Sequence, residues 1–477
     1  MTVTNRPQRD IARTLARRGT VLFAVRLFPA AAVLFVMIFL SKKVDQTMYG
    51  HYQNFWVRYA LLSTVTCLGF PSFALVLRPE QLIAATKCLS APILWLFLLI
   101  NLALGFAFGI WEADVTPFWL PIGTLIIFGT ATMLEGWLLA VRSFKVVLVS
   151  NALYALVFVL IHCFWTYDGA SLVPLLTTLL LLGAGRLLVL LIACLSRLRI
   201  PTDSGRLEVQ DKRLWVQLGV YDLLQQGARL SDKFLVSFLV APALSAIYFN
   251  GAQEVPFLSL LLGAAGGALV QQAAVGTRDD VTETVTTARV AGQLLSNAVF
   301  PLFWWLLLFR EELFEVVFST RYAESATIFA ASLLILPLRA YPFTSLLQHY
   351  RRGDLINLGA LLDLILALLL APLLYMLFGL PGVALSFSIA TLGLAVFYLY
   401  HTSRISGVRI VDLIPVRNWI IKLAGSGVVF IGIRYIAMGW QQMGFRLFLG
   451  AAAAGLLASL TFWADLRKTP VKYGKKL

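Results

Sequence analysis

One apolar segment, residues 214–239, carries polar side chains at the spacing of a helix. They are Asp222, Gln226, Arg229 and Lys233, at positions i, i+4, i+7 and i+11. In a helix this spacing places all four on one face. Arginine and lysine on one face can bind an anion, and the arginine fork matches the oxygens of a phosphate group. The stripe therefore predicts a site for an anionic ligand.

A second interpretation of the same stripe is purely structural. Gln225 and Asp232 flank the same stripe on the helix surface. Asp222 and Asp232 could neutralise the two cations and form a salt-bridged seam between helices. The sequence alone leaves both interpretations open.

Other ionisable side chains also stand inside apolar segments. The basic ones are Arg26, Arg58, Arg186 and Arg339, and the acidic ones are Glu135 and Asp363. A charge facing lipid at mid-depth costs on the order of 3 kcal/mol, so most of these groups must face protein or water. The cations lie at several depths, which suits an anion that crosses the membrane. The two acids either pair with a neighbouring arginine or serve as proton or cation sites for coupling.

Three further cations, Lys422, Arg434 and Arg446, lie near the ends of apolar segments. At such positions, long basic side chains can reach the headgroup region while their stems stay in the apolar layer. We therefore predict that these three snorkel to the membrane surface.

The composition explains why so many charges lie in apolar sequence. Hydrophobic residues make up 59% of the 477 residues and charged residues 13%, whereas soluble domains have about 45–50% and about 25%. Continuous apolar runs favour membrane helices over a β-barrel. The sequence therefore predicts an all-α, polytopic membrane protein with about fourteen spans. The predicted spans are 20–40, 53–77, 82–110, 117–141, 146–165, 170–196, 214–239, 247–274, 288–310, 323–348, 355–378, 380–401, 417–438 and 442–463.

Basic residues are distributed unevenly between the predicted connections. The N-terminal segment, the C-terminal tail and every second connection hold nearly all of the loop cations, whereas the other connections hold only Lys42, Lys43, Arg310 and Arg321. By the positive-inside rule, both termini are predicted to be cytoplasmic. The net charge of +15 thus reflects helix orientation, and no nucleic-acid partner is expected.

The longest predicted cytoplasmic connection divides the chain. We expect an N-terminal lobe of six helices over 1–198, a polar linker over 199–213 and a C-terminal lobe of six helices over 214–402. Residues 403–477 add two helices and a basic tail. Two halves of even span number point the same way, which is the parallel-repeat arrangement of transporters.

No cofactor, metal site or enzymatic activity is expected. The four cysteines and four histidines show no metal-ligand spacing. Every loop is short, whereas a membrane enzyme that acts on saccharides usually needs a sizeable extramembrane domain.

Several segments, in their order along the chain, resemble the polysaccharide flippases of the multidrug/oligosaccharidyl-lipid/polysaccharide exporter superfamily. They are Met48-Tyr49-Gly50, Ser231-Asp232-Lys233-Phe234, Glu312-Leu313-Phe314-Glu315 and Gly379-Leu380-Pro381-Gly382. The resemblance implies a two-lobed bundle that moves an isoprenoid-diphosphate-linked saccharide from the cytoplasmic to the outer leaflet, by alternating access through a basic central cavity.

The resemblance also implies site residues, location and partners. By position, Arg26, Arg58, Arg229 and Lys233 would bind the diphosphate. From their residue types and their positions in apolar sequence, Asp222, Gln226, Asp232 and Arg339 are further candidates for the cavity, and Glu135 and Asp363 are the coupling candidates. The protein would lie in a bacterial inner membrane among lipids, with the lipid-linked saccharide as its ligand and other polysaccharide-assembly proteins as its partners.

A cation-coupled antiporter for drugs or other small molecules, from the same superfamily, is the alternative. Such antiporters bind mostly cations through acidic residues. Here basic residues outnumber acidic ones in the deep set, which favours the flippase.

Overall fold

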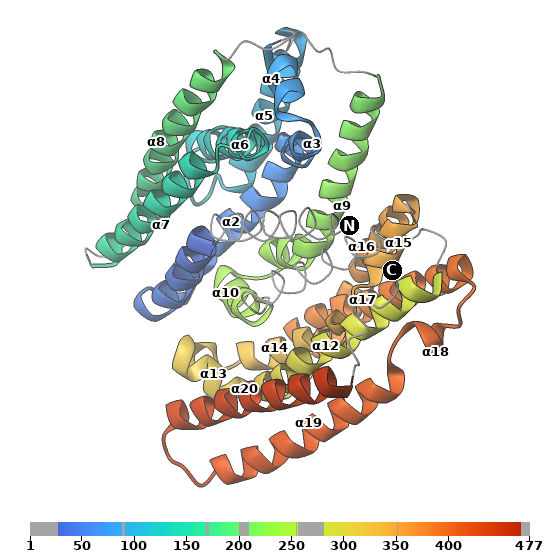
Figure 1. Ribbon diagram of the computed structural model, residues 1–477. Coiled ribbons are helices and arrows are strands. Elements are labelled where there is room, and N and C mark those ends of the chain that lie inside the picture. The colour runs from blue at the N-terminus through green and yellow to red at the C-terminus, as the bar shows by residue number, and fades with distance from the viewer. Residues whose placement is uncertain are drawn as a thin grey trace. The chain divides into compact units, whose positions relative to one another are not determined.

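The computed structural model describes residues 27–87, 91–167, 171–199, 209–253, 255, 281–350 and 352–468 (Figure 1). Every regular element in these ranges is a helix, and none is a strand. The predicted all-α class is therefore confirmed. Arg26 lies outside the described residues.

Eight helices in the described part are long and apolar enough to cross a membrane. They are Trp119–Ala140, Phe144–Thr166, Leu172–Leu198, Val285–Leu308, Gly353–Phe378, Leu380–Ser406, Val416–Ala437 and Met443–Asp465. A bent pair of helices forms a ninth candidate, and Trp95–Trp111 is a shorter apolar helix. The protein is thus a multi-pass membrane protein. The count of about fourteen spans stays a prediction, because most of 247–274 lies outside the described residues.

The chain packs into two compact units. Unit 1 comprises the chain up to Leu230 together with Phe234–Ala246, and unit 2 comprises Ser231–Lys233 and the chain from Ile247 onward. This division falls later than the predicted linker at 199–213, since helix α9 packs with the N-terminal helices. The assignment of transport lobes stays a prediction.

Unit 1 is built around helix α6. Its elements are a helix over 27–43, α2 (Gln46–Cys67), α3 (Phe70–Val76), α4 (Pro79–Lys87), α5 (Ala91–Trp111), α6 (Trp119–Ala140), α7 (Phe144–Tyr167), α8 (Leu172–Leu198), most of α9 (Val209–Leu239) and the start of α10 (Pro242–Gly251). Helix α6 contacts α2, α3, α5, α7 and α8. Leu138 of α6 and Leu190 of α8 are fully buried in the resulting core.

The second predicted span, 53–77, is broken between α2 and α3, which meet at a bend of 48°. Leu68 and Gly69 adopt positive φ angles of 50° and 67°. The indole of Trp215 on α9 donates a hydrogen bond of 2.8 Å to the carbonyl oxygen of Leu68, which the break leaves without its helical partner. A Cβ on Gly69 would lie 2.3 Å from Cα of Gly219, so two glycines permit this close contact. The break thus fixes α9 to unit 1.

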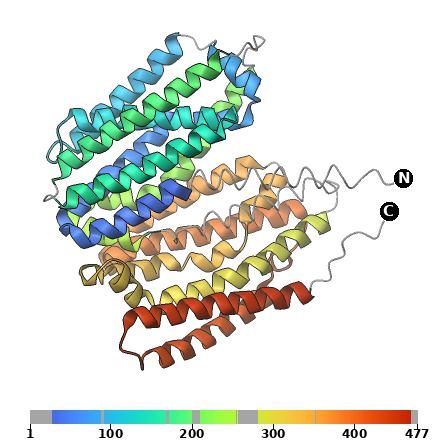
Figure 2. The same ribbon diagram turned by 60° about the vertical axis from the view of Figure 1, so that its left-hand side comes forward.

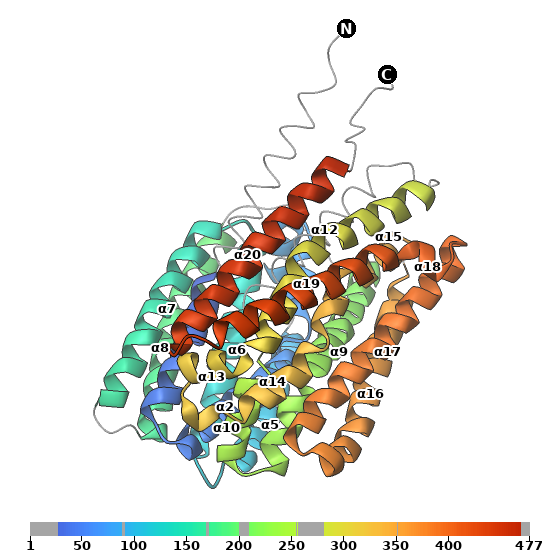
Figure 3. The ribbon, with the colours of Figure 1, turned by 90° about the horizontal axis from the view of Figure 1, so that it is seen from below.

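Unit 2 contains the remaining elements of the described ranges. They are the end of α10, α12 (Val281–Leu308), α13 (Arg310–Val317), η1 (Thr320–Tyr322), α14 (Ser325–Leu333), η2 (Leu336–Ala340), α15 (Phe343–His349), α16 (Gly353–Phe378), α17 (Leu380–Ser406), α18 (Ile410–Leu413), α19 (Val416–Ala437) and α20 (Met443–Lys468). Helix α12 contacts both α19 and α20, and these long helices run alongside one another (Figure 2). Helices α16 and α17 form an extensive antiparallel hairpin (Figure 3).

The tenth predicted span, 323–348, is not one continuous helix. Helices α14, η2 and α15 replace it. Pro337 lies in the first turn of η2, and Pro342 caps α15. Proline lacks the amide donor that a continuing helix needs, so the two prolines explain the breaks.

Two ion-pair clusters hold the C-terminal helices to the rest of unit 2. Lys422 of α19 lies 2.5 Å from Asp465 of α20, whose carboxylate also accepts a hydrogen bond of 2.9 Å from Asn297 of α12. Toward the other ends of these helices, Arg434 pairs with buried Glu312 of α13. The snorkelling predicted for Lys422 and Arg434 was wrong, because each meets an acidic partner inside the protein.

Candidate substrate-binding site

The polar stripe lies on α9, a helix of 31 residues. Since α9 is a continuous α-helix over this range, Asp222, Gln226, Arg229 and Lys233 do share one helical face. Arg229 is exposed, and Lys233 is half-buried. Helix α9 is long enough to span the bilayer, but it is not among the eight apolar helices. The stripe contributes to this difference, because it adds charged side chains to the middle of α9.

The C-terminal part of the stripe contains an ion pair. The Asp232 carboxylate is buried and accepts a hydrogen bond of 3.0 Å from the hydroxyl of Tyr248. The same oxygen lies 3.7 Å from the ammonium of Lys233. The salt-bridged interpretation therefore holds for Lys233, whose charge is partly offset. At 3.7 Å the two groups are farther apart than in a hydrogen-bonded pair.

Arg58 is bonded to the protein on every side. Its guanidinium lies 2.7 Å from Glu112, and it donates to the carbonyl oxygen of Trp111 at 3.1 Å. It also donates to the side chain and the carbonyl oxygen of Ser237 on α9, and it stacks on Phe238 with 4.2 Å between the guanidinium carbon and the ring centre. Burial raises the pKa of the Glu112 carboxyl, and the Arg58 charge opposes that rise. Arg58 thus fastens α2, α5 and α9 together.

Glu112 was missed by the sequence analysis. It follows the apolar run of the third predicted span, so the sequence indicates an ordinary acidic residue at the membrane interface. Glu112 is 1% exposed because the fold packs it against Arg58, which lies 54 positions away in the sequence. No local sequence pattern predicts such a contact.

Glu135 belongs to a second polar network in unit 1, and this network is partly buried. Its carboxylate pairs with Arg186 of α8 and accepts a hydrogen bond of 3.0 Å from the amide of Asn151 on α7. Arg186 also donates to the Asn151 amide oxygen at 2.7 Å and stacks over Tyr154. Of the two alternatives for Glu135, the structure has the ion-paired one.

Arg339 lines a pocket of about 270 Å³ within unit 2. The pocket is formed where η2 and α15 break the tenth span, and Thr344, Thr391 and Tyr398 also line it. A discontinuous membrane helix is a common way to build a ligand site, because its free backbone groups can bind polar ligands.

Asp363 lies next to this pocket. Thr391, one of the pocket residues, interacts with the Asp363 carboxylate. The Oδ1 atom of Asp363 is buried without a hydrogen-bond partner in the described part of the chain. Unlike Glu135, Asp363 therefore retains capacity to bind a proton or a cation.

The predicted site residues thus fall into separate groups. Unit 1 contains Arg58, Glu135, Asp222, Gln226 and Arg229, and unit 2 contains Asp232, Lys233, Arg339 and Asp363. Asp222 interacts with the side chain of Ser72. Within the described ranges, no group of three or more His, Cys, Asp and Glu side chains could hold a metal ion.

The architecture is similar to that of solved structures of membrane transport proteins. No protein-family model and no curated protein sequence matches the chain. A structure of the lipid II flippase MurJ in an inward closed conformation matches with a TM-score of 0.62 and 13% identity, over 93% of this chain and 98% of MurJ. An inward-facing MATE family transporter of the MOP superfamily matches with a TM-score of 0.56 and 17% identity, over 79% of this chain and 94% of the transporter. The chain therefore has the fold shared by the MurJ lipid II flippase and the MATE transporters of the MOP superfamily.

Proposed function

We propose that this protein is a transporter that flips an isoprenoid-diphosphate-linked oligosaccharide from the cytoplasmic to the outer leaflet, for the synthesis of a cell-surface polysaccharide. The observation that carries the proposal is the stripe on α9, which puts Arg229 and Lys233 on one face of a long helix of a membrane protein. Phosphate oxygens are strong acceptors for such a pair. The fold supports the proposal, since the MurJ match extends over nearly the whole chain.

The four stripe residues have distinct roles in this proposal. Arg229 and Lys233 bind the diphosphate, and Asp222 and Gln226 bind sugar hydroxyls, for which carboxylate and amide groups are suitable partners. Asp232 holds Lys233 in place through its own bond to Tyr248. Arg58 supports the stripe indirectly by fixing the C-terminal end of α9. Arg26 remains a candidate on the resemblance alone.

A cation-coupled antiporter is the second candidate. The observation that favours it is Asp363, whose buried oxygen has no hydrogen-bond partner in the described part of the chain. The MATE match supports the same candidate. A proton or cation at Asp363 could equally drive a flippase, so the identity of the transported ligand separates the two candidates.

Lipids that co-purify with the gently solubilised protein test the proposal by native mass spectrometry. We expect an isoprenoid-diphosphate saccharide on the wild-type protein and its loss from Arg229→Ala/Lys233→Ala. The matched control is Lys212→Ala/Arg213→Ala, which removes two exposed cations from the same helix outside the stripe and should leave the lipid bound. Only bulk phospholipid, together with proton-coupled efflux of a cationic dye in vesicles, would favour the antiporter instead.

A further inference from the structure

An apolar groove of about 680 Å³ runs along α7 and α8 within unit 1. Val149 and Leu153 line it from α7, and Leu181 and Gly185 line it from α8. Leu153 is 58% exposed and Leu181 68% exposed. Because both helices are long apolar membrane helices, the groove opens toward lipid. None of the candidate substrate residues lines it.

The groove has two basic residues and no acidic residue in its lining. The Arg186 charge is offset by Glu135, as described above. Lys145, in the first turn of α7, is exposed, and no acidic side chain in the described ranges pairs with it. The groove therefore ends at one uncompensated cation.

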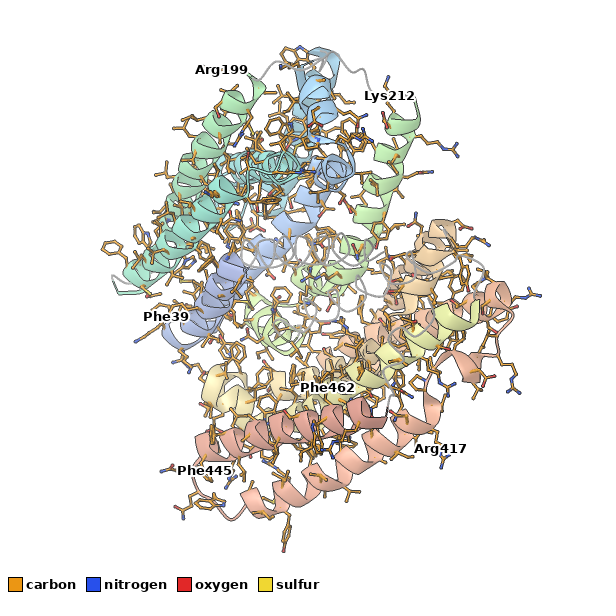
Figure 4. All side chains as sticks on the ribbon, in the orientation of Figure 1. Phe39, Arg199, Lys212, Arg417, Phe445 and Phe462 are labelled. Atoms are coloured by element: carbon orange, nitrogen blue, oxygen red, sulfur yellow. The ribbon has the colours of Figure 1, made fainter. Side chains whose placement is uncertain are left out.

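Further cations lie at the same end of the α7–α8 pair. The helices are consecutive and packed against each other, so the start of α7 lies beside the end of α8. Arg197 and Arg199 are exposed at that end of α8, where Figure 4 labels Arg199. By the positive-inside rule this end faces the cytoplasm. An apolar channel with a basic mouth is complementary to a lipid that has an anionic headgroup.

The length of the groove indicates how long a hydrocarbon chain of an anionic lipid can fit in it. Lys145 and Val157 both line it, and twelve residues of helix span about 18 Å. Half of a hydrocarbon core of about 30 Å is about 15 Å. The groove is therefore as long as one leaflet, which matches an acyl chain, whereas a long polyprenyl chain would extend beyond it.

We propose that this groove is a binding site for an anionic phospholipid of the cytoplasmic leaflet, with one acyl chain between α7 and α8 and the phosphate at Lys145. The site is independent of the proposed transport function. Phosphatidylglycerol is therefore expected to bind more tightly than phosphatidylcholine. This preference should depend both on the Lys145 cation and on the open groove between α7 and α8.

Two variants separate the groove from general surface charge. A Cβ at Gly185 would meet no other atom within 4 Å, so Gly185→Leu adds apolar bulk to the groove without a clash at its Cβ. Its control is Leu188→Phe, which adds bulk at a 57% exposed position of α8 outside the groove. Lys145→Gln removes the cation, and its control is Lys212→Gln, at an exposed lysine on α9.

The measurement is native mass spectrometry of the full-length variants in equimolar phosphatidylglycerol and phosphatidylcholine. We expect a preference for phosphatidylglycerol that falls about five-fold in Lys145→Gln, the effect of one cation near an anionic surface. It should also be lost in Gly185→Leu and unchanged in both controls. Equal binding of the two lipids by the wild-type protein would overturn the proposal. So would a preference that survives Gly185→Leu, or displacement of bound phosphatidylglycerol by an equimolar polyprenyl phosphate.

Discussion

The ion pair between Arg58 and Glu112 gives the sharpest test of how unit 1 is held together. The Arg58 side chain is 11% exposed and the Glu112 side chain 2% exposed, with 2.7 Å between them. Removal of one partner from a buried pair costs about 3–5 kcal/mol, because the other charge remains buried and unpaired. We therefore expect Arg58→Ala to reduce the free energy of unfolding by about 3 kcal/mol or more. This is a large share of a typical stability of about 5–15 kcal/mol.

A double-mutant cycle isolates the pair from the other contacts of Arg58. Arg58→Ala/Glu112→Ala should be less destabilised than the sum of the two single variants, since the double variant buries no unpaired charge. We expect a coupling energy of about 2 kcal/mol, measured by denaturant unfolding in detergent with tryptophan fluorescence as the signal. The control cycle is Arg409 and Asp412, an exposed pair at 2.8 Å whose side chains are 86% and 42% exposed, where coupling should stay below about 1 kcal/mol. Equal coupling in the two cycles would refute the reasoning.

Three further predictions concern packing in the two units. Gly382→Ala should strongly lower the thermal midpoint, because its Cβ would lie 1.9 Å from the carbonyl oxygen of Leu374. The control is Gly425→Ala, whose Cβ would have no atom within 4 Å, and this change should be neutral or stabilising by up to about 1 kcal/mol. Lys422→Met should destabilise unit 2 by about 3 kcal/mol in denaturant unfolding, and Asp465→Asn in the same chain should recover part of that loss. Trp215→Phe should cost about 1–3 kcal/mol in the same assay, since the Leu68 carbonyl loses its hydrogen bond; an unchanged midpoint would contradict this role of the indole.

The helical membrane fold could be predicted because it depends on local properties. Apolar runs of about 20 residues report directly on bilayer thickness, and the turn at Gly379-Leu380-Pro381-Gly382 was visible as a boundary. The breaks were not predicted equally well. Pro337 and Pro342 lie inside an apolar run, so hydropathy alone does not indicate a helix break at either residue.

The partners of the buried charges could not be predicted. The sequence marks Arg58, Arg186 and Lys422 as costly in lipid, but their partners are set by tertiary contacts over 54, 51 and 43 positions. The helical stripe on α9 needs only helix periodicity, so its geometry was available from sequence. Its ligand was not, because the same spacing serves an anion site and a salt-bridged seam.

The central claim is that the α9 stripe carries an isoprenoid-diphosphate saccharide across the membrane. The most direct test is flipping of such a fluorescent lipid in proteoliposomes, scored by the fraction accessible to a membrane-impermeant quencher. We predict that the wild-type protein and Lys212→Ala/Arg213→Ala equilibrate the lipid between leaflets, and that Arg229→Ala/Lys233→Ala slows this to the rate of protein-free vesicles while remaining folded. Wild-type flipping by Arg229→Ala/Lys233→Ala, or no flipping by the wild-type protein, would contradict the claim.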